Sequence, residues 1–245
     1  MGHGVIFRRI TQHLKDQNWF AMVLDLLIVV VGIFIGLQVD AWNESRQERV
    51  MEGNYLERLL VDMNLSIEVQ LEVFELEKAG IDSMDKLARD LKEGTLNEQD
   101  RDSTVQALNY IGWVENPKTR LVTLNELQSS GNISQIQNSE IRDALGQLKR
   151  SLEDAIYSAE QTSMLFSSNY DLILQSAFLE PSDEEDWGYV SHPDYDYMLS
   201  IPDFAKAISS YSGWFKFHRT LLQAHHRDTI ALRDKIQAEL ETRFR

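Results

Sequence analysis

Residues 19–42 read Trp-Phe-Ala-Met-Val-Leu-Asp-Leu-Leu-Ile-Val-Val-Val-Gly-Ile-Phe-Ile-Gly-Leu-Gln-Val-Asp-Ala-Trp, and this stretch decides the fold. From Leu26 to Leu37 it carries no polar side chain. A helix of about 20 apolar residues crosses a hydrocarbon core about 30 Å thick. Trp19 and Trp42 stand at the two ends, where indole rings favour the headgroup layer. The stretch therefore predicts one transmembrane helix with an aromatic anchor at each interface.

Two other interpretations of this stretch are weaker. A buried core helix fits poorly, because the rest of the chain is too polar to surround a helix that is apolar on all sides. A cleaved signal peptide could end at the small residues around Val39–Ala41, but the apolar stretch is long for that role. It is also interrupted near its start by Asp25.

The charge of the chain limits its partners. The formal net charge is −15, and residues 1–39 carry three basic and two acidic side chains, so the negative charge belongs to the chain beyond the apolar stretch. Such a surface repels nucleic acid, which we do not expect as a partner. The chain has no cysteine, which excludes disulfides, thiolate metal sites and cysteine nucleophiles.

The prolines outline the helices of the remaining chain, because proline breaks the interior of a helix. The first proline is Pro117, and a first helix is expected to continue from the membrane stretch to about Gly94. Gly131 suits a left-handed C-cap, and Ser200 is expected to cap the last helix with Pro202 in its first turn. No stretch predicts a sheet. The other helices are expected at about 98–114, 119–129, 138–179 and 202–243.

Apolar residues beyond the membrane stretch recur at near-heptad spacing, which predicts one helical face. The intervening acidic and basic residues are interpreted as a solvated face, Asp62 among them. The apolar stripe contains Leu56, Leu60, Met63, Ile67, Leu71 and Phe74, and the solvated face Glu57, Arg58, Asp62, Glu68, Glu72 and Glu75.

The predicted fold is all-α, with one N-terminal transmembrane helix that continues into a mostly antiparallel helical bundle outside the membrane. The expected segments are a short basic segment at 1–18, the transmembrane helix at 19–42, a stalk and first bundle helix at 43–94, and a bundle domain at 95–245. An acidic loop is expected at 180–203.

Two blocks of sequence resemble a bacterial family of single-pass membrane proteins, one of the domains of unknown function. The first runs from Leu24 to Glu44 and ends in Gln-Val-Asp-Ala-Trp-Asn-Glu, and the second is Thr-Leu-Asn-Glu-Leu-Gln-Ser-Ser-Gly-Asn-Ile at 123–133 with Ile-Gln-Asn at 136–138. The resemblance covers the first 60 residues well and the middle third moderately. It implies a membrane-anchored helical domain and no activity.

The orientation is predicted from the basic residues that flank the helix. Arg8, Arg9 and Lys15 form a compact group before it, whereas the basic residues after it alternate with acidic ones. Basic flanks favour the cytoplasm, so we expect a cytoplasmic N-terminus and a periplasmic C-terminal domain in the bacterial inner membrane.

Three residues inside the membrane stretch are candidate contact residues. Gly32 and Gly36 form a Gly-x-x-x-Gly motif that lets another helix approach closely. Asp25 precedes Gly32 by seven residues, so the three lie on roughly one face. A carboxylate in the bilayer is costly, and it marks a partner helix, a proton path or a contact with the headgroups. The run around Asp25 is also similar to the membrane helix of stator subunits linked to peptidoglycan or TonB, in which one aspartate takes part in proton flow.

The acidic loop and the last helix offer weaker candidates. The loop could contact a partner through its aromatic residues Trp187, Tyr189, Tyr195 and Tyr197, or these could pack on the bundle. Its carboxylates do not follow the spacing of an EF-hand, and we expect no metal. His218 and His225 share a face but are seven residues apart, which is too far for a simple zinc pair.

The sequence carries no nucleophile motif, phosphate loop or metalloprotease motif, so neither an enzyme nor a cofactor is expected. The leading hypothesis is a non-catalytic membrane-anchored subunit or scaffold, which forms a homo-oligomer or joins a larger membrane complex. One alternative is a proton-linked, stator-like subunit that uses Asp25. Another is a ligand-sensing helical bundle.

Overall fold

The computed structural model describes residues 4–111, 113–168, 170–181 and 189–244. The fold is all-α, as the sequence predicts, apart from one short hairpin. The helices are α1 (Gly4–Glu93), α2 (Arg101–Ile111), α3 (Val122–Ser129), α4 (Ser139–Ser168), α5 (Tyr170–Leu174), α6 (Tyr195–Ser200) and α7 (Phe204–Arg243), with 3-10 turns at Glu98–Asp100 and Asn132–Gln135 and strands β1 (Ala177–Pro181) and β2 (Tyr189–Pro193).

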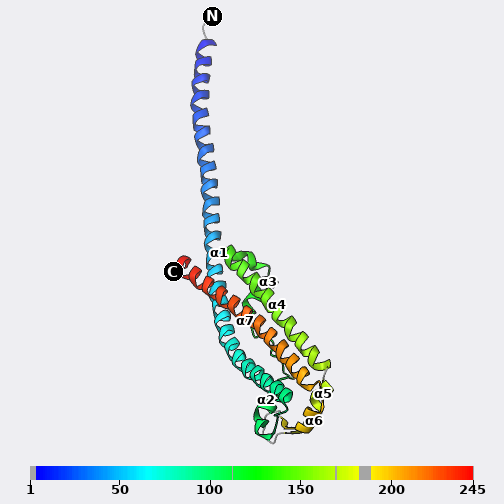
Figure 1. The fold of residues 1–245 in the computed structure, drawn as a ribbon. Coiled ribbons are helices and arrows are strands. Elements are labelled where there is room, and N and C mark those ends of the chain that lie inside the picture. Colours follow the sequence, from blue (N-terminus) through cyan, green and yellow to red (C-terminus); the bar gives the residue numbers. More distant parts are fainter. Residues whose placement is uncertain (1–3, 112, 169, 182–188, 245) are drawn as a thin grey trace. The chain divides into compact units, whose positions relative to one another are not determined.

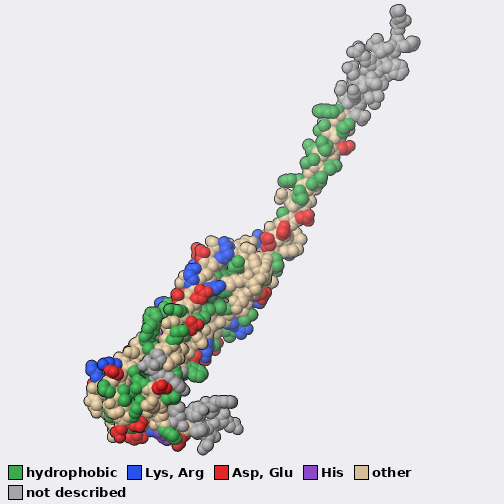
Figure 2. All heavy atoms as spheres, turned by 90° about the vertical axis from the view of Figure 1, so that its right-hand side faces the viewer, with side chains coloured by type: hydrophobic (Ala, Val, Ile, Leu, Met, Phe, Trp, Pro, Cys, Tyr) green, Lys and Arg blue, Asp and Glu red, His purple; other side chains and the backbone are tan. Residues whose placement is uncertain are grey.

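The contacts divide the chain into two compact units, Met1–Gly53 and Asn54–Arg245, and helix α1 contributes to both. The first unit contains an 18-residue window with a mean hydropathy of 2.6, none of which is buried. Hydrophobic side chains cover the face of this segment that is shown in Figure 2. One N-terminal helix is therefore long and apolar enough to span a membrane.

The second unit is a helical bundle built from three long helices. Helices α4 and α7 lie side by side and run in opposite directions, and the part of α1 after residue 54 packs alongside them (Figure 1). Helices α2, α5 and α6 gather with the hairpin at the end of the bundle where α1 finishes.

The bundle buries two large apolar clusters and a small one formed by Val73, Ala155 and Leu222. The first apolar cluster joins residues 56–63 of α1 to α3, α4 and the end of α7. The second joins the end of α1 to α2, α6 and the start of α7. The first contains Leu56, Leu59, Met63, Leu124, Leu127, Ile136, Ile141, Leu145, Leu148, Leu232 and Ile236. The second contains Ile81, Met84, Leu87, Leu91, Leu96, Ala107, Leu108, Ile111, Ile173, Met198, Phe204, Ile208, Tyr211 and Phe215.

The predicted buried stripe of α1 is wrong in its middle part. Leu71 is 52% exposed, whereas Asp62, which was assigned to the solvated face, is 4% exposed. The heptad spacing is kept, but between the two large apolar clusters it places polar side chains on the buried face, and two of them, Ser66 and Gln70, form hydrogen bonds with the segment between α2 and α3. The buried face of α1 passes through Leu56, Leu59, Met63, Ser66, Gln70, Val73, Glu77, Ile81, Met84, Leu87 and Leu91.

The segment at 177–203 differs from the predicted loop. Strands β1 and β2 pair in antiparallel fashion, with Ala177 opposite Pro193, and helix α6 follows them. Ser200 ends α6 and does not cap the last helix, because α7 begins at Phe204 with Asp203 in the capping position. Helix α4 ends at Ser168, although the predicted helix continues to about residue 179. Strand β1 already begins at Ala177.

The two predicted helix ends at glycine are confirmed. Gly94 and Gly131 follow α1 and α3, and both adopt a positive φ, of 68° and 74°. A residue without a Cβ adopts this left-handed conformation at no steric cost, so the chain can turn sharply after each helix.

Gly80 permits a close approach between α1 and the Tyr110 ring of α2. A Cβ atom at this position would lie 2.2 Å from Cγ of Tyr110, whose ring packs in turn on Phe215 with 4.9 Å between centroids. We expect Gly80→Ala to lower the free energy of unfolding by about 2 kcal/mol, because overpacking outweighs the gain in helix propensity. Urea denaturation followed by circular dichroism measures this change.

A matched control is Gly213→Ala on α7, where a Cβ would meet nothing within 4 Å. This variant should be at least as stable as the wild type. Adding Tyr110→Ala to Gly80→Ala should relieve the clash. Equal stability of Gly80→Ala and Gly213→Ala would show that the approach of α2 to α1 is not tight.

Candidate functional site

The three candidate residues of the apolar segment lie on an exposed part of α1. Asp25 is exposed, and a Cβ built on Gly32 or Gly36 meets nothing within 4 Å. Because a helix turns 100° per residue, the three positions fall within about 40° of one another. Trp19 and Trp42 are 69% and 67% exposed at the two ends of the segment.

The aromatic candidates of the acidic loop divide into two groups. Trp187 lies outside the described residues, as does the side chain of Tyr189. Tyr195 and Tyr197 belong to α6 and pack against the second apolar cluster. The hydroxyl of Tyr197 also donates a hydrogen bond to Oε1 of Gln175 at 3.1 Å. These two tyrosines therefore contact the bundle itself.

A group of buried polar side chains, which sequence reasoning did not identify as a site, lies between the two large apolar clusters. We call it the polar layer, and it takes two residues from each long helix of the bundle. The two residues on each helix are seven apart, so they project from one face at two successive levels. The polar layer consists of Gln70 and Glu77 on α1, Ser151 and Ser158 on α4, and His218 and His225 on α7.

One level is centred on His218, which is wholly buried. Its Nε2–H donates to the carbonyl oxygen of Glu115 at 2.9 Å, and its Nδ1 lies 2.6 Å from the Ser158 hydroxyl. Because Nε2 carries the proton, Nδ1 accepts the hydrogen bond from Ser158. Burial lowers the pKa of His218, so this ring is held neutral.

The other level is centred on His225. Its Nε2 lies 2.6 Å from the Thr119 hydroxyl, which also accepts a hydrogen bond from the Gln70 amide at 3.2 Å. Its Nδ1 lies 2.9 Å from the hydroxyl of Ser151, which donates to the carbonyl of Leu148. Each ring nitrogen of His225 thus lies against a hydroxyl group, and one of the two nitrogens carries the proton of the neutral ring. Burial lowers the pKa of His225 to about 4.

Glu77 is the one carboxyl of the polar layer, and its side chain is 1% exposed. Neither carboxyl oxygen has a hydrogen-bond partner among the described residues, and Oε1 lies 3.7 Å from Nε2 of His218. Burial raises the pKa of Glu77 to about 7; Arg219 opposes this increase and Glu115 adds to it. The neighbouring hydroxyl of Tyr110 is also buried and has no hydrogen-bond partner in the described part of the chain, and burial together with Glu77 raises the pKa of that phenol.

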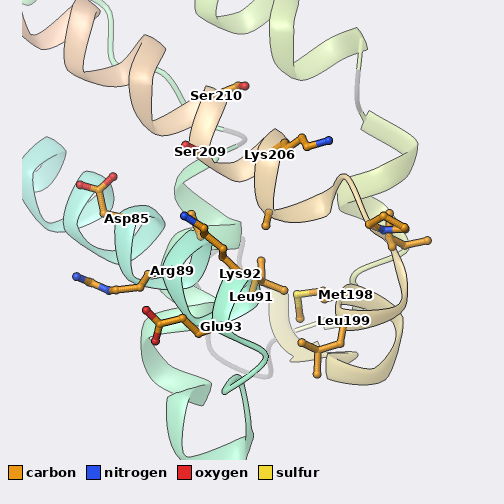
Figure 3. Close-up of a pocket in the computed structure, with 14 residues that line it drawn as sticks. Asp85, Arg89, Leu91, Lys92, Glu93, Met198, Leu199, Lys206, Ser209 and Ser210 are labelled. Carbon is orange, nitrogen blue, oxygen red and sulfur yellow. The ribbon is translucent and has the colours of Figure 1, made fainter.

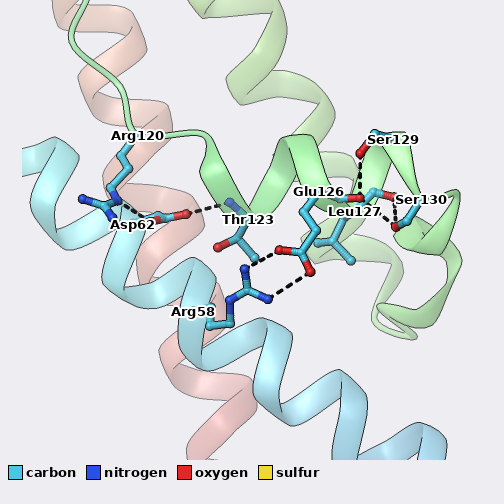
Figure 4. Close-up of polar contacts among 8 residues, drawn as sticks. All are labelled: Arg58, Asp62, Arg120, Thr123, Glu126, Leu127, Ser129 and Ser130. Carbon is cyan, nitrogen blue, oxygen red and sulfur yellow. Dashed lines mark hydrogen bonds and ion pairs between the residues drawn. The ribbon is translucent and has the colours of Figure 1, made fainter.

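The connection between α2 and α3, residues 113–121, supplies the outer partners of the polar layer and is fixed to α1 by Asp62 (Figure 4). One carboxylate oxygen of Asp62 accepts a hydrogen bond from Nε of Arg120 at 2.9 Å, and the other from the backbone N–H of Thr123 at 2.9 Å. Leu121 makes no side-chain cap at the start of α3. Asp62 therefore caps α3 from a neighbouring helix.

The polar layer can bind and release a proton near neutral pH, but its carboxyl is not positioned to reach a substrate. Glu77 and His218 are both covered by the surrounding helices, whereas general acid–base catalysis needs a group within hydrogen-bond distance of the reacting molecule. Within the residues that the structure describes, no three His, Cys, Asp or Glu side chains are grouped so that they could hold a metal ion.

No family model, no curated protein and no solved structure matches this chain. The resemblance to a family of single-pass membrane proteins therefore stays a prediction.

Proposed function

We propose that this chain is a non-catalytic subunit or scaffold that is anchored in the bacterial inner membrane by the apolar segment of α1. In this proposal the N-terminus lies in the cytoplasm and the helical bundle in the periplasm. The segment associates with a second helix through Gly32 and Gly36, and the bundle offers an acidic surface to protein partners.

One observation carries the proposal. The apolar segment of α1 buries none of its hydrophobic window, while the bundle formed by residues 54–245 has three apolar clusters of its own. Exposed apolar side chains over this length need a lipid environment. Within lipid, two glycines with open space above them allow close contact between backbones.

The test is the mass and composition of the complex that the full chain forms when it is extracted from its own membrane in mild detergent. We expect an assembly larger than the single 28.3-kDa chain. Gly32→Leu/Gly36→Leu should reduce the assembly towards the single chain, because two leucines keep the helices apart. Partner chains in the wild-type complex would identify a hetero-oligomer, and their absence a homo-oligomer.

A matched control adds bulk to the opposite face of the same segment. Val30→Leu/Leu37→Phe should leave the mass of the assembly unchanged, since these positions point away from the two glycines. An assembly that survives Gly32→Leu/Gly36→Leu would refute association through this face. A wild-type chain that is monomeric in several mild detergents would refute the scaffold itself.

A further inference from the structure

A broad groove opens at the end of the bundle where α1 finishes. It has a volume of about 1180 Å³ and lies between the last turns of α1, the segment 198–202 and the first turns of α7 (Figure 3). Pockets that bind drug-sized ligands have volumes of roughly 300–1,000 Å³. The groove is therefore large enough for a short segment of peptide.

The floor of the groove is apolar. Leu91 and Met198 are 9% and 1% exposed and belong to the second apolar cluster, so they form a fixed surface. Leu199 stands beside them and is 41% exposed. Leu199 and the exposed Pro202 therefore offer the apolar surface that a ligand with apolar side chains would remove from water.

Basic side chains border the groove on two sides. Arg89 and Lys92 come from α1 and Lys206 from α7, and all three are exposed. Arg89 and Lys92 have no ion pair among the described residues, whereas Lys206 pairs with the exposed Asp203 at 2.7 Å. Two cationic groups are thus free to bind an anion, and a third is held only by a pair at the surface.

The carboxylates of the groove cancel part of these charges. Asp85 is already engaged, because Lys216 lies 2.7 Å away and Ser212 donates a hydrogen bond to it. Glu93, the other carboxylate in the lining, is exposed and offsets one of the two free basic groups, so the three basic and two acidic side chains of the lining leave an excess of one positive charge. Elsewhere the chain is acidic, with a net charge of −15 and no Lys or Arg from Ser151 to Ala205. An anionic ligand is therefore repelled by most of the surface and attracted here.

The directions of the basic side chains indicate the shape of the ligand. Figure 3 shows that Arg89, Lys92 and Lys206 point in different directions and do not converge on one point. A single phosphate or carboxylate group needs converging donors. Charges spread along the border of an apolar floor instead suit an extended ligand with several separate carboxylates.

We infer that this groove binds an acidic peptide segment of a partner protein, with apolar side chains on the floor and carboxylates against Arg89, Lys92 and Lys206. The inference rests on the proposed scaffold function and gives the scaffold a site for its partner. The binding energy would come from the apolar contacts, and the charges would supply selectivity and sensitivity to salt.

The inference is tested by fluorescence anisotropy with the full-length protein in detergent. The probes are labelled octapeptides that alternate Asp or Glu with Leu or Phe, and the same peptides with Asn and Gln in place of the acids. We expect the acidic peptides to bind and the amide peptides to bind on the order of tenfold more weakly. Arg89→Glu/Lys92→Glu should weaken binding of the acidic peptides on the order of tenfold or more.

A control with the same change in charge is Lys149→Glu/Arg150→Glu, at exposed positions of α4 outside the groove. It should leave binding close to that of the wild type. Equal losses in the two double variants, or no binding of any acidic peptide, would overturn the inference. Displacement of the peptides by millimolar inorganic phosphate would also overturn it, because the groove would then be a site for small anions.

The result is independent of the membrane helix. Gly32→Leu/Gly36→Leu should bind the peptides as the wild type does, because these residues lie outside the bundle. Loss of the assembly tests association through the membrane helix, and loss of peptide binding tests the groove. Because the two readouts are separate, the failure of one proposal is distinguished from the failure of the other.

Discussion

Glu77→Gln should remove a pH-dependent loss of stability from this protein. Burial raises the pKa of Glu77 from 4.5 to about 7, so the folded chain binds a proton that the unfolded chain has already released between these pH values. The contribution of this group is fully present below pH 4.5 and is lost as the pH rises through 7. A shift of this size corresponds to about 3 kcal/mol above pH 8.

We therefore expect wild type and Glu77→Gln to have similar stability near pH 4.5 and to differ by about 3 kcal/mol at pH 8.5, with the variant more stable. Urea denaturation of the full chain in detergent at a series of pH values measures the difference. Glu75→Gln, at an exposed position of the same helix, should follow the wild-type pH dependence. A constant difference between wild type and Glu77→Gln at all pH values would contradict the assignment.

His225 has the opposite effect on the pH dependence of the free energy of unfolding. Burial lowers its pKa from 6.5 to about 4, so the unfolded chain binds a proton that the folded chain does not. The contribution of His225 is present above pH 6.5 and is lost as the pH falls through 4. Between pH 4.5 and 6.5 the contributions of Glu77 and His225 to the pH dependence of stability oppose each other.

Asp62→Ala should destabilise the bundle by about 3 kcal/mol, because it leaves the buried N–H of Thr123 without an acceptor and removes the partner of Arg120. The side chain of Asp62 is 6% exposed and that of Arg120 is 54% exposed. Most of the lost stability therefore comes from the backbone N–H of Thr123, which loses its helix cap, and less from the exposed ion pair. Urea denaturation measures the loss. The amide of Thr123 should also exchange with solvent much faster.

Two controls separate the roles of charge and position. Glu126→Ala removes the nearby pair with Arg58, which is exposed on both sides, and should cost far less than Asp62→Ala. Asp62→Asn keeps an acceptor for Thr123 and should lie between Asp62→Ala and the wild type. Equal effects of Asp62→Ala and Glu126→Ala would show that Asp62 does not fix the connection.

The long helices and several of their ends could be predicted from the sequence. The proline-free stretches contain α1, α4 and α7, because only a long helix satisfies backbone groups over such lengths without turns. Gly94 and Gly131 end helices because each is followed by a polar, non-periodic stretch and has no Cβ. These helices and helix ends can be predicted because the signals depend only on residues that are close together in the sequence.

The polar layer could not be predicted, because it depends on partners distant in the sequence. On α1 the apolar residues Ile67, Leu71 and Phe74 appear to continue the stripe, yet Gln70 and Glu77 occupy the buried face. The choice is made by side chains on α7 and on the connection at 113–121, as the contacts of Gln70 with Thr229 and Thr119 illustrate. The repeated seven-residue spacing of Ser and His was a visible signal, but it did not identify the helix that they face.

For a similar reason the hairpin was missed, and the connection at 113–121 was predicted to be shorter than it is. Strand β1 follows α5 closely and carries no period-2 pattern that stands out from a helical one. The connection has no regular structure, and it is held by side chains of α1 and α7. Neither segment can be recognised without knowing what covers it.

The doubled polar layer also fixes how far the helices of the bundle can slide along one another. Apolar heptads alone are degenerate, since a shift by seven residues again places apolar side chains against apolar side chains. Here such a shift of α7 against α4 would keep one Ser–His hydrogen bond and break the other. The stranded serine and histidine would then face apolar residues, which penalises the shifted arrangement. The two levels of the polar layer thus favour a single axial alignment of α7 against α4.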